Sequence, residues 1–407
     1  MRLDDLEARA PDHLDMGDPD SLAAIDELVD AITTEHPTLE DIAAYEDGSV
    51  DAPTAVRAAA RIAHSHIEAA DHSSPVDVSV VVAMYNEHER LLPRSEHPHG
   101  ENSLLQKVAQ LDALHSINPV WSWQMLLVDD GCPNGSGAVA QRIVDEHGLE
   151  GRVRVMYLAD GIAEGSPGVG ALRSTDESRK GGSIEYGLWT AAADARPNHV
   201  AVFTDADLST HLGQVPSLVL PIVDDGAAMS IGSRREPGSV VVKGGSRAAR
   251  GRLFIYLWKQ MLGPLAGVTD TQCGFKALRT AGLRDLVEST IEKQFAFDIE
   301  LLLLTDAAGG AIDRFPVAWI DSEAASTTDD GIYLTMLKAV ATMYRGHDRH
   351  ADQAEAFVEL VEEMSPEAWH RLLDNAPMTL LDHDPTEFDE LGPIVAAEEI
   401  DRLSAGV

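Results

Sequence analysis

The chain has 407 residues, 44% of them hydrophobic, which is enough to bury one large core or two smaller ones. Its 68 acidic residues outnumber the 31 basic ones and give a formal net charge of −37, which disfavours nucleic acid and anionic lipid headgroups as general partners. Two cysteines are too few for a disulfide framework or a cysteine-based zinc site, and no apolar run approaches the ~20 residues that a membrane helix needs.

The two ends of the chain are expected to form acidic helical appendages. In residues 1–75, apolar residues recur at helical spacing over 21–32, and the stretch 55–70 is rich in alanine. Residues 351–407 are also acidic and are punctuated by proline. Neither appendage carries a pattern typical of chemistry, so packing or partner binding is the expected role of both.

Strands and helices alternate through the central domain, which we place at 76–350. Short β-branched or apolar runs predict buried strands, and helical segments such as 137–146 and 183–193 separate them. The alternation predicts an α/β fold with a mostly parallel sheet flanked by helices, in which ligands lie beyond the carboxyl ends of the strands. The predicted strands are 78–83, 123–128, 153–158, 199–204 and 227–232.

Two stretches interrupt this alternation. Residues 93–102 form a polar segment with proline, histidine and glycine, and residues 160–179 are rich in glycine, serine and acid without an apolar period. A structureless loop as long as 160–179 is usually a lid, a binding loop or a disordered segment.

Asp205 and Asp207 directly follow the fourth predicted strand at a spacing of i, i+2. Alternate side chains of a strand point to the same face, so both carboxylates can meet one ion where the strand ends. Hard divalent cations prefer oxygen ligands, and Mg²⁺ or Mn²⁺ in such sites is usually shared with substrate phosphates. An acidic turn is the alternative explanation for this pair.

Polar residues also follow the first two predicted strands. After the first strand, Glu87 and the neighbouring backbone could contact a nucleobase or ribose, or could simply cap a helix. After the second, Asp129 and Asp130 precede Gly131, which suits either an acidic turn or a carboxylate that accepts from a base N–H.

Cations gather in three places. Lys180 precedes a helix expected to run from Ser183, where backbone N–H groups favour phosphate, although a glycine-rich loop end is as good an explanation. Arg234 follows the fifth strand and could hold a diphosphate or lie on the surface. Lys243, Arg247, Arg250 and Arg252 reverse the sign of the local charge in an acidic protein, which favours an anion site over a solvated helix face.

Two acids near the end of the domain could act as bases. Asp298 and Glu300 stand at the start of an amphipathic helix, and a buried acid that faces a cleft could be a general base. Both could instead be acids favoured by the helix dipole, and for Glu300 this second explanation is preferred.

Together these segments resemble family 2 glycosyltransferases of the GT-A fold, and most closely the dolichyl- or polyprenyl-phosphate glucosyl- and mannosyltransferase branch. The resemblance runs from about residue 76 to 319, in the order and spacing of that branch, and the run Asp-Thr-Gln-Cys-Gly-Phe-Lys at 270–276 is specific to it. The matching segments are 78–87, 128–131, 180–182, 205–210, 232–234, 270–276, 297–302 and 317–319.

The resemblance implies roles for individual residues. Asp205 and Asp207 would hold Mg²⁺ or Mn²⁺ and the diphosphate, and an acceptor hydroxyl would need a base, with Asp270 the first candidate and Asp298 the second. The acceptor would be bound by Arg247, Arg250, Gln272 and Lys276. The nucleotide-sugar donor would be bound by Ala83, Tyr85, Glu87, Asp130, Lys180, Ala206 and Arg234.

The chain departs from the family pattern at 129–136, where the usual Asp-Asp-Gly-Ser-x-Asp-Gly-Thr reads Asp-Asp-Gly-Cys-Pro-Asn-Gly-Ser. The asparagine that usually precedes the Gly-Lys-Gly motif is also displaced, by the segment 160–179. Sugar preference is therefore not carried over from the family.

The expected function is a metal-dependent, inverting transfer of a hexose from a UDP- or GDP-sugar to a polyprenyl phosphate. A soluble phosphorylated or hydroxylated acceptor is the main alternative, and the acidic surface favours it. A sugar nucleotidyltransferase would need a basic, glycine-rich loop after the first strand, where 84–87 reads Met-Tyr-Asn-Glu, and a non-catalytic binding protein is a further alternative. The expected location is cytoplasmic, with peripheral contact to the inner face of the membrane left open.

Overall fold

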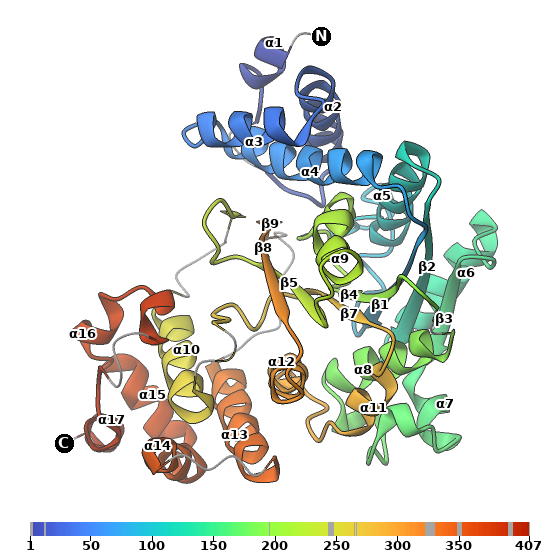
Figure 1. Cartoon of the computed structure of the whole chain (residues 1–407). Coiled ribbons are helices and arrows are strands. Elements are labelled where there is room, and N and C mark those ends of the chain that lie inside the picture. Colours follow the sequence, from blue (N-terminus) through green and yellow to red (C-terminus); the bar gives the residue numbers. More distant parts are fainter. Residues whose placement is uncertain are drawn as a thin grey trace.

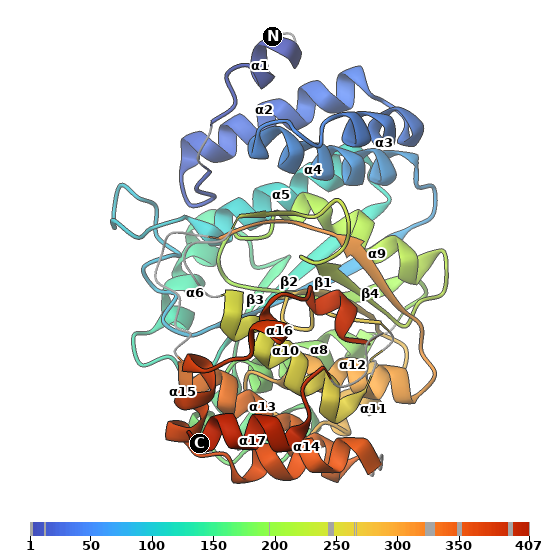
Figure 2. The ribbon, with the colours of Figure 1, turned by 90° about the vertical axis from the view of Figure 1, so that its left-hand side faces the viewer.

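A computed structural model gives the fold of the chain (Figure 1). It describes residues 3–11, 14–194, 196–242, 248–263, 265, 267–321, 330–347, 352–389 and 394–406. Helices α1–α4 lie at one end of the molecule and α10 with α13–α17 at the other, with the main sheet between them (Figures 1 and 2).

The N-terminal helices form a layer built around α4. Asp18 caps α2 through a hydrogen bond from the Ser21 N–H, and Thr38 caps α3 in the same way from Asp41. The alanine-rich stretch of α4 lets α2 and α3 approach it closely, and α4 in turn packs on α5 and α9. The helices are α1 (Leu3–Glu7), α2 (Pro19–Glu35), α3 (Leu39–Gly48) and α4 (Thr54–Asp71).

In the described residues the main sheet has seven strands in the order β3-β2-β1-β4-β7-β5-β8. All neighbours are parallel except β7, which runs antiparallel to both β4 and β5. The predicted α/β class with a mostly parallel sheet is therefore confirmed. The strands are β1 (Val76–Met84), β2 (Trp121–Asp129), β3 (Val153–Tyr157), β4 (His199–Thr204), β5 (Met229–Ser233), β7 (Phe275–Arg279) and β8 (Ile312–Pro316).

Helices cover both faces of this sheet. On β1, Val80 and Val82 pack with α5, α6 and α9, whereas Val81 packs on the other face with α8. This double burial explains the continuous apolar run of β1. The helices are α5 (Ser103–Ile117), α6 (Ser136–His147), α8 (Gly181–Ala191), α9 (Val215–Val223), α11 (Leu283–Glu288) and α12 (Phe297–Ala307).

The segment 160–179 is not structureless, contrary to the prediction. Helix α7 (Leu158–Ala163) begins directly after β3, and single 3₁₀ turns follow at Pro167–Val169 and Thr175–Glu177. Glycines allow this segment to lie tightly over α8, since a side chain at Gly161 would collide with Tyr186 and one at Gly168 with Trp189. Such contacts between distant residues leave no periodic signal in the sequence.

Helix α10 (Ala248–Leu262) and the C-terminal helices form one packed lobe. Leu253, Tyr256 and Trp258 of α10 are fully buried. The Tyr256 hydroxyl donates to the Val395 carbonyl at 2.5 Å and accepts from the Val395 N–H at 3.0 Å. The other helices of the lobe are α13 (Asp330–Gly346), α14 (Asp352–Glu363), α15 (Pro366–Asp374), α16 (Met378–Leu381) and α17 (Ala397–Ala405).

A second, two-stranded sheet joins the N-terminal layer to the central domain. It pairs β6 (Val240–Val242) in parallel with β9 (Ala318–Ile320), and both strands contribute to the core under α4. No helix among the described residues has both the length and the apolar character to cross a membrane.

Candidate active site

The carboxyl end of β4 carries the two predicted metal ligands. Asp205 forms an ion pair with the Lys180 ammonium, and both side chains remain about one third exposed, at 32% and 31%. Asp207 accepts a hydrogen bond from the Ser209 N–H at 3.0 Å, which fixes one of its oxygens. Burial raises the pKa of Asp205, but the charges of Lys180 and Lys107 outweigh it and hold this pKa below its usual value.

These two carboxylates could hold a divalent cation only with additional ligands. Among the described residues, no group of three or more histidine, cysteine, aspartate or glutamate side chains is arranged to hold a metal ion. Two carboxylates at an exposed strand end fit a hard cation whose other ligands are phosphate and water oxygens. Gly274, just before β7, leaves room for this arrangement, because a methyl group there would collide with the Asp205 carboxylate.

Lys180 reaches the site from an unusual backbone conformation. Its φ of 74° and ψ of −48° lie outside the ordinary helical region, and helix α8 begins with the next residue rather than at Ser183. Asp130 holds this turn: one oxygen accepts from the Lys180 N–H at 2.9 Å and the other from the Ser183 hydroxyl at 2.7 Å. Asp130 is buried, and both of its oxygens hold the turn that carries Lys180.

The loops after β1 and β2 interlock. The Glu87 N–H donates to the Ser136 hydroxyl at 2.9 Å, and the Asn86 N–H donates to the Cys132 sulfur at 3.3 Å. The altered residue Asn134 donates to the Asn86 side chain at 2.9 Å, so the departure from the family pattern supports this contact. Tyr85 and Asn86 are exposed in this loop, whereas Ala206 lies in the core and can offer only its backbone.

Glu87 is mostly buried and forms an ion pair with Arg90, which also donates to Glu101 at 3.0 Å. Burial raises the pKa of Glu87 to about 7, although Arg90 opposes the effect. The carboxyl group therefore changes its charge near neutral pH.

Arg234 and Asp270 are joined by three hydrogen bonds. The Asp270 carboxylate accepts from the Arg234 Nε at 2.8 Å, from a terminal guanidinium nitrogen at 2.7 Å, and from the Arg234 backbone N–H at 2.7 Å. Burial alone would raise the pKa of Asp270, but Arg234 holds it well below its usual value. Asp270 is thus a poor proton acceptor, which argues against its predicted role as the first candidate base.

Lys276, a predicted acceptor ligand, and Asp298, the second candidate base, form another buried pair. The Lys276 ammonium donates to Asp298 at 3.0 Å and to the Cys273 carbonyl at 2.5 Å, and Gln272 donates to the other Asp298 oxygen at 2.7 Å. Lys276 has no exposed surface and Asp298 is 4% exposed. Lys276 therefore cannot meet an acceptor as placed, and Asp298 is held as the partner of an internal cation.

The remaining predicted residues lie apart from this centre. Glu300 is buried and accepts from the backbone N–H groups of Ile291 and Glu292, so it binds a neighbouring loop. Arg250 is exposed on α10, whereas Arg252 donates to the Leu381 carbonyl within the C-terminal lobe. Lys243 and Arg247 lie outside the described residues.

Lys107 of α5 was not predicted, although its charge interacts with those of Asp207 and Asp205. It is 1% exposed and its ammonium has no hydrogen-bond partner among the described residues. Its position in the sequence was a usable signal, because it interrupts the apolar stripe of α5 formed by Leu104, Val108, Leu111 and Leu114. Burial lowers the pKa of the Lys107 ammonium, and the charges of Asp207 and Asp205 oppose this effect.

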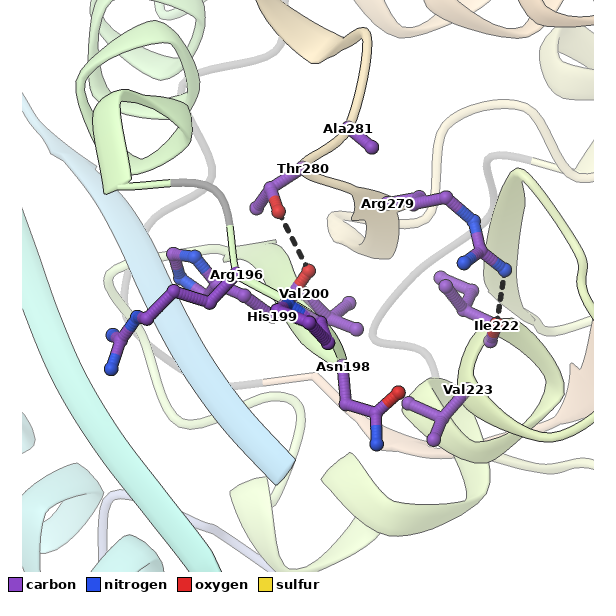
Figure 3. Close-up of a pocket in the computed structure, with 10 residues that line it drawn as sticks. Arg196, Asn198, His199, Val200, Ile222, Val223, Arg279, Thr280 and Ala281 are labelled. Carbon is purple, nitrogen blue, oxygen red and sulfur yellow. Dashed lines mark hydrogen bonds between the residues drawn. The ribbon is translucent and has the colours of Figure 1, made fainter. Parts of the chain in front are cut away.

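A cavity of about 260 Å³ lies elsewhere, at the amino end of β4 (Figure 3). The Thr280 hydroxyl donates to the His199 carbonyl at 2.8 Å, and Arg279 donates to the Ile222 carbonyl. Two arginines line this cavity; Arg279 is thus already used by the backbone, and Arg196 forms ion pairs with Asp77 and Asp194. The cavity lies at the opposite edge of the sheet from Asp205 and Asp207 and is not part of the candidate site.

No protein-family model matches the chain. It is 25% identical over 274 residues to the dolichyl-phosphate beta-glucosyltransferase of Drosophila melanogaster, a match that covers 65% of this chain and 74% of the relative. It is 26% identical over 251 residues to the glycosyltransferase AglD of Haloferax volcanii, a match that covers 62% of this chain and 34% of AglD.

Among solved structures, the glucosyl-3-phosphoglycerate synthase of Mycobacterium tuberculosis in complex with Mn²⁺, UDP and its product matches 72% of this chain and 85% of its own. The sequence identity is 18% and the TM-score is 0.45.

Proposed function

We propose, from the premise that this chain is a glycosyltransferase, that it moves a hexose from a UDP- or GDP-sugar to a polyprenyl phosphate with inversion at the anomeric carbon. The observation that carries the proposal is the meeting of Asp205, Asp207 and Lys180 at the carboxyl edge of the sheet. Dolichyl-phosphate glucosyltransferases among the relatives supply the acceptor class.

In the donor site, Asp205 and Asp207 would hold Mg²⁺ or Mn²⁺. The bound ion would act as a Lewis acid that stabilises the departing nucleoside diphosphate. Lys180 would release Asp205 and pair with the diphosphate, and the first turn of α8 would add the favourable end of its dipole. Such preorganised positive charge is usually the largest single contribution to catalysis.

The nucleoside would lie over the loops after β1 and β2. Tyr85 is exposed there and offers a ring for stacking, and ionised Glu87 would accept from the base or ribose. Asp130 would act indirectly, by fixing the backbone of Lys180.

The proposed acceptor is a phosphate because the two candidate bases are both occupied. Asp270 is bound by Arg234, and Asp298 by Lys276 and Gln272. A hydroxyl acceptor would need one of them as a base, whereas a phosphate oxygen is already an anion and attacks without one. Of the basic run at 243–252, Arg250 is described and exposed on α10, and it would bind that phosphate.

A soluble phosphorylated acceptor is the second candidate. The net charge of −37 favours it, because an acidic surface is repelled by anionic membranes. The chemistry of the donor site would be the same for both acceptors.

The test is sugar transfer by the purified full chain with Mn²⁺ or Mg²⁺, UDP-glucose or GDP-mannose, and three acceptors. These are a short-chain polyprenyl phosphate in detergent, a small phosphorylated acid, and the matching unphosphorylated polyprenol. Transfer to polyprenyl phosphate alone supports the leading proposal, and transfer to the small acid alone replaces it by the second. Transfer to the polyprenol would contradict the phosphate-acceptor argument, and no transfer from either donor would contradict both candidates.

A further inference from the structure

The loop between α11 and α12 lies against the turn that carries Lys180. The carbonyl of Lys293 in this loop accepts from the Gly182 N–H at 2.9 Å and from the Arg179 N–H at 3.2 Å. These two N–H groups flank Lys180 in the chain. Gly181 packs on the same loop, because a methyl group there would collide with the loop backbone. A single carbonyl group of a neighbouring loop therefore binds the chain on both sides of Lys180.

Lys180 depends on such support because of its backbone conformation. A φ of 74° with a ψ of −48° is costly for a residue with a side chain, and it persists only where the surrounding structure imposes it. Asp130 holds the N–H of Lys180 itself, at 2.9 Å, and the Lys293 carbonyl holds the neighbouring residues. The direction in which the Lys180 ammonium points thus depends on where Lys293 lies.

Two fully buried acids set the position of this loop. The backbone N–H groups of a loop need acceptors, and Glu300 of α12 accepts from the Glu292 N–H at 2.8 Å and from the Ile291 N–H at 3.0 Å. Glu185 of α8 forms an ion pair with the Lys293 ammonium. The loop is therefore held through its backbone by one acid and through its lysine by the other.

The two acids differ in what they join to the loop. Glu185 belongs to α8, the helix that begins directly after Lys180, so it moves with the turn. Glu300 belongs to α12, and its carboxylate also lies 2.6 Å from the Nε2 of His347, which follows α13. Glu300 is thus the residue that anchors the loop to the rest of the protein.

We propose that Glu300 is a positioning residue of the donor site. It fixes the loop at 290–294, and through the Lys293 carbonyl it fixes the backbone at 179–182, so that the Lys180 ammonium is held where the diphosphate binds. The inference rests on the proposed function, since it takes the diphosphate as the partner of Lys180. Glu300 itself touches neither the donor nor the acceptor.

The test is a double-mutant cycle on the binding of UDP or GDP in the presence of Mn²⁺, measured by isothermal titration calorimetry. Lys180→Met should raise the Kd of the preferred nucleotide by at least roughly tenfold, and Glu300→Leu should raise it by roughly fivefold to tenfold. If Glu300 acts through Lys180, adding Glu300→Leu to Lys180→Met should change the Kd by less than about twofold. Calorimetry reports the Kd separately from the fraction of protein that binds, so a loss of folded protein alone would leave the Kd unchanged.

Glu68→Leu is the matched control for the loss of a carboxylate. Glu68 is partly buried and accepts from the Ser217 hydroxyl, between α4 and α9. Its replacement should lower the melting temperature and leave the Kd of the nucleotide unchanged.

Two milder variants test the geometry of the anchor. In Glu300→Gln the amide oxygen can still accept from the N–H groups at 291 and 292, and the amide nitrogen can donate to His347, so the Kd should stay within about threefold of wild type. Glu300→Asp withdraws the carboxylate by one methylene group and should raise the Kd as Glu300→Leu does. The test therefore stands even if Glu300→Leu does not fold.

The outcomes separate the two proposals. If wild type binds neither nucleotide, the proposed function fails and this inference fails with it. If Lys180→Met weakens nucleotide binding but Glu300→Leu and Glu300→Asp do not, only the inference fails. Equal weakening by Glu300→Leu in the presence and in the absence of Lys180 would also overturn the inference, because Glu300 would then act independently of Lys180.

Discussion

The guanidinium of Arg234 and the carboxylate of Asp270 meet in a two-pronged hydrogen-bonded pair at 2.7 and 2.8 Å, beside the ring of Trp319, which lies 5.1 Å from the guanidinium carbon. A carboxylate held in this way is a stable anion and a weak base. The pair therefore joins the end of β5 to the turn before β7.

Asp270→Asn should destabilise the protein in a pH-dependent manner. The pKa of Asp270 is lowered in the folded state, so its contribution to stability is complete above the unfolded value of about 4 and is lost as the pH falls towards the folded value. The difference in unfolding free energy between wild type and Asp270→Asn should be about 2–4 kcal/mol at pH 7 and should shrink below about pH 4. Denaturant unfolding from pH 3 to 7 measures it, and a difference that stays constant with pH would contradict this account.

Glu87 should make donor binding sensitive to pH near neutrality. Because burial raises the pKa of Glu87 to about 7, the carboxyl group is largely neutral at pH 6 and largely ionised at pH 8. If the ionised form binds the nucleoside, the KM for the donor should fall as the pH rises through about 7, and this change should disappear in Glu87→Gln.

The same group has an opposite effect on stability. Its folded pKa lies above its unfolded pKa of about 4.3, so ionisation costs stability progressively as the pH rises from about 4.3 to 7. Glu87→Gln should thus gain stability relative to wild type as the pH rises over that range. A gain that is the same at pH 5 and pH 8 would rule out the raised pKa.

Lys180 offers a test that separates charge from backbone strain. Lys180→Ala and Lys180→Gly both remove the ammonium, and both should lower kcat/KM by about 10²–10³ through loss of charge at the diphosphate. Only glycine relieves the cost of a φ of 74°, so Lys180→Gly should be more stable than Lys180→Ala by about 1 kcal/mol. Equal stability of the two variants would mean that the turn is not strained.

Gly274→Ala should remove activity without unfolding the protein. Its new methyl group would displace the Asp205 carboxylate, so Mn²⁺ binding in the presence of nucleotide should weaken by at least about tenfold. Gly251→Ala is the matched control, since a methyl group there meets nothing within 4 Å and lies in helix α10, where alanine adds about 1 kcal/mol of stability. Normal Mn²⁺ binding by Gly274→Ala would show that Asp205 is not a metal ligand.

The sequence was informative where local chemistry decides the structure. Runs such as the one in β1 are apolar on both faces, so they predict buried parallel strands, and parallel strands bring Asp205, Asp130 and Glu87 to one edge. The gathering of these three residues at one edge of the sheet could therefore be predicted from the sequence alone.

The sequence was less informative where the strand or ion-pair partner of a residue lies far away along the chain. Strand β7 was not predicted because it is short, contains Lys276, and obtains its pairing from β4 and β5, which precede it by many residues. The internal pairing of Lys276 with Asp298 has the same origin, since the two residues lie on different elements. The sequence does not distinguish a lysine that faces solvent from one that pairs with a buried carboxylate.

The antiparallel direction of β7 affects which parts of the chain can differ in length or sequence between related proteins. The chain leaves the sheet at the carboxyl end of β5, passes through β6 and α10, and returns at the start of β7 to the same edge that it left. Both ends of this excursion are fixed, one by Arg234 and the other by Asp270, which are joined to each other. An exchange of this segment, together with its partners β9 and the C-terminal helices, would leave β1, β2 and β4 and their polar loops in place. The same sheet could in this way acquire a new acceptor specificity through changes in the segment from β6 to α10 and its packing partners, with its donor half unchanged.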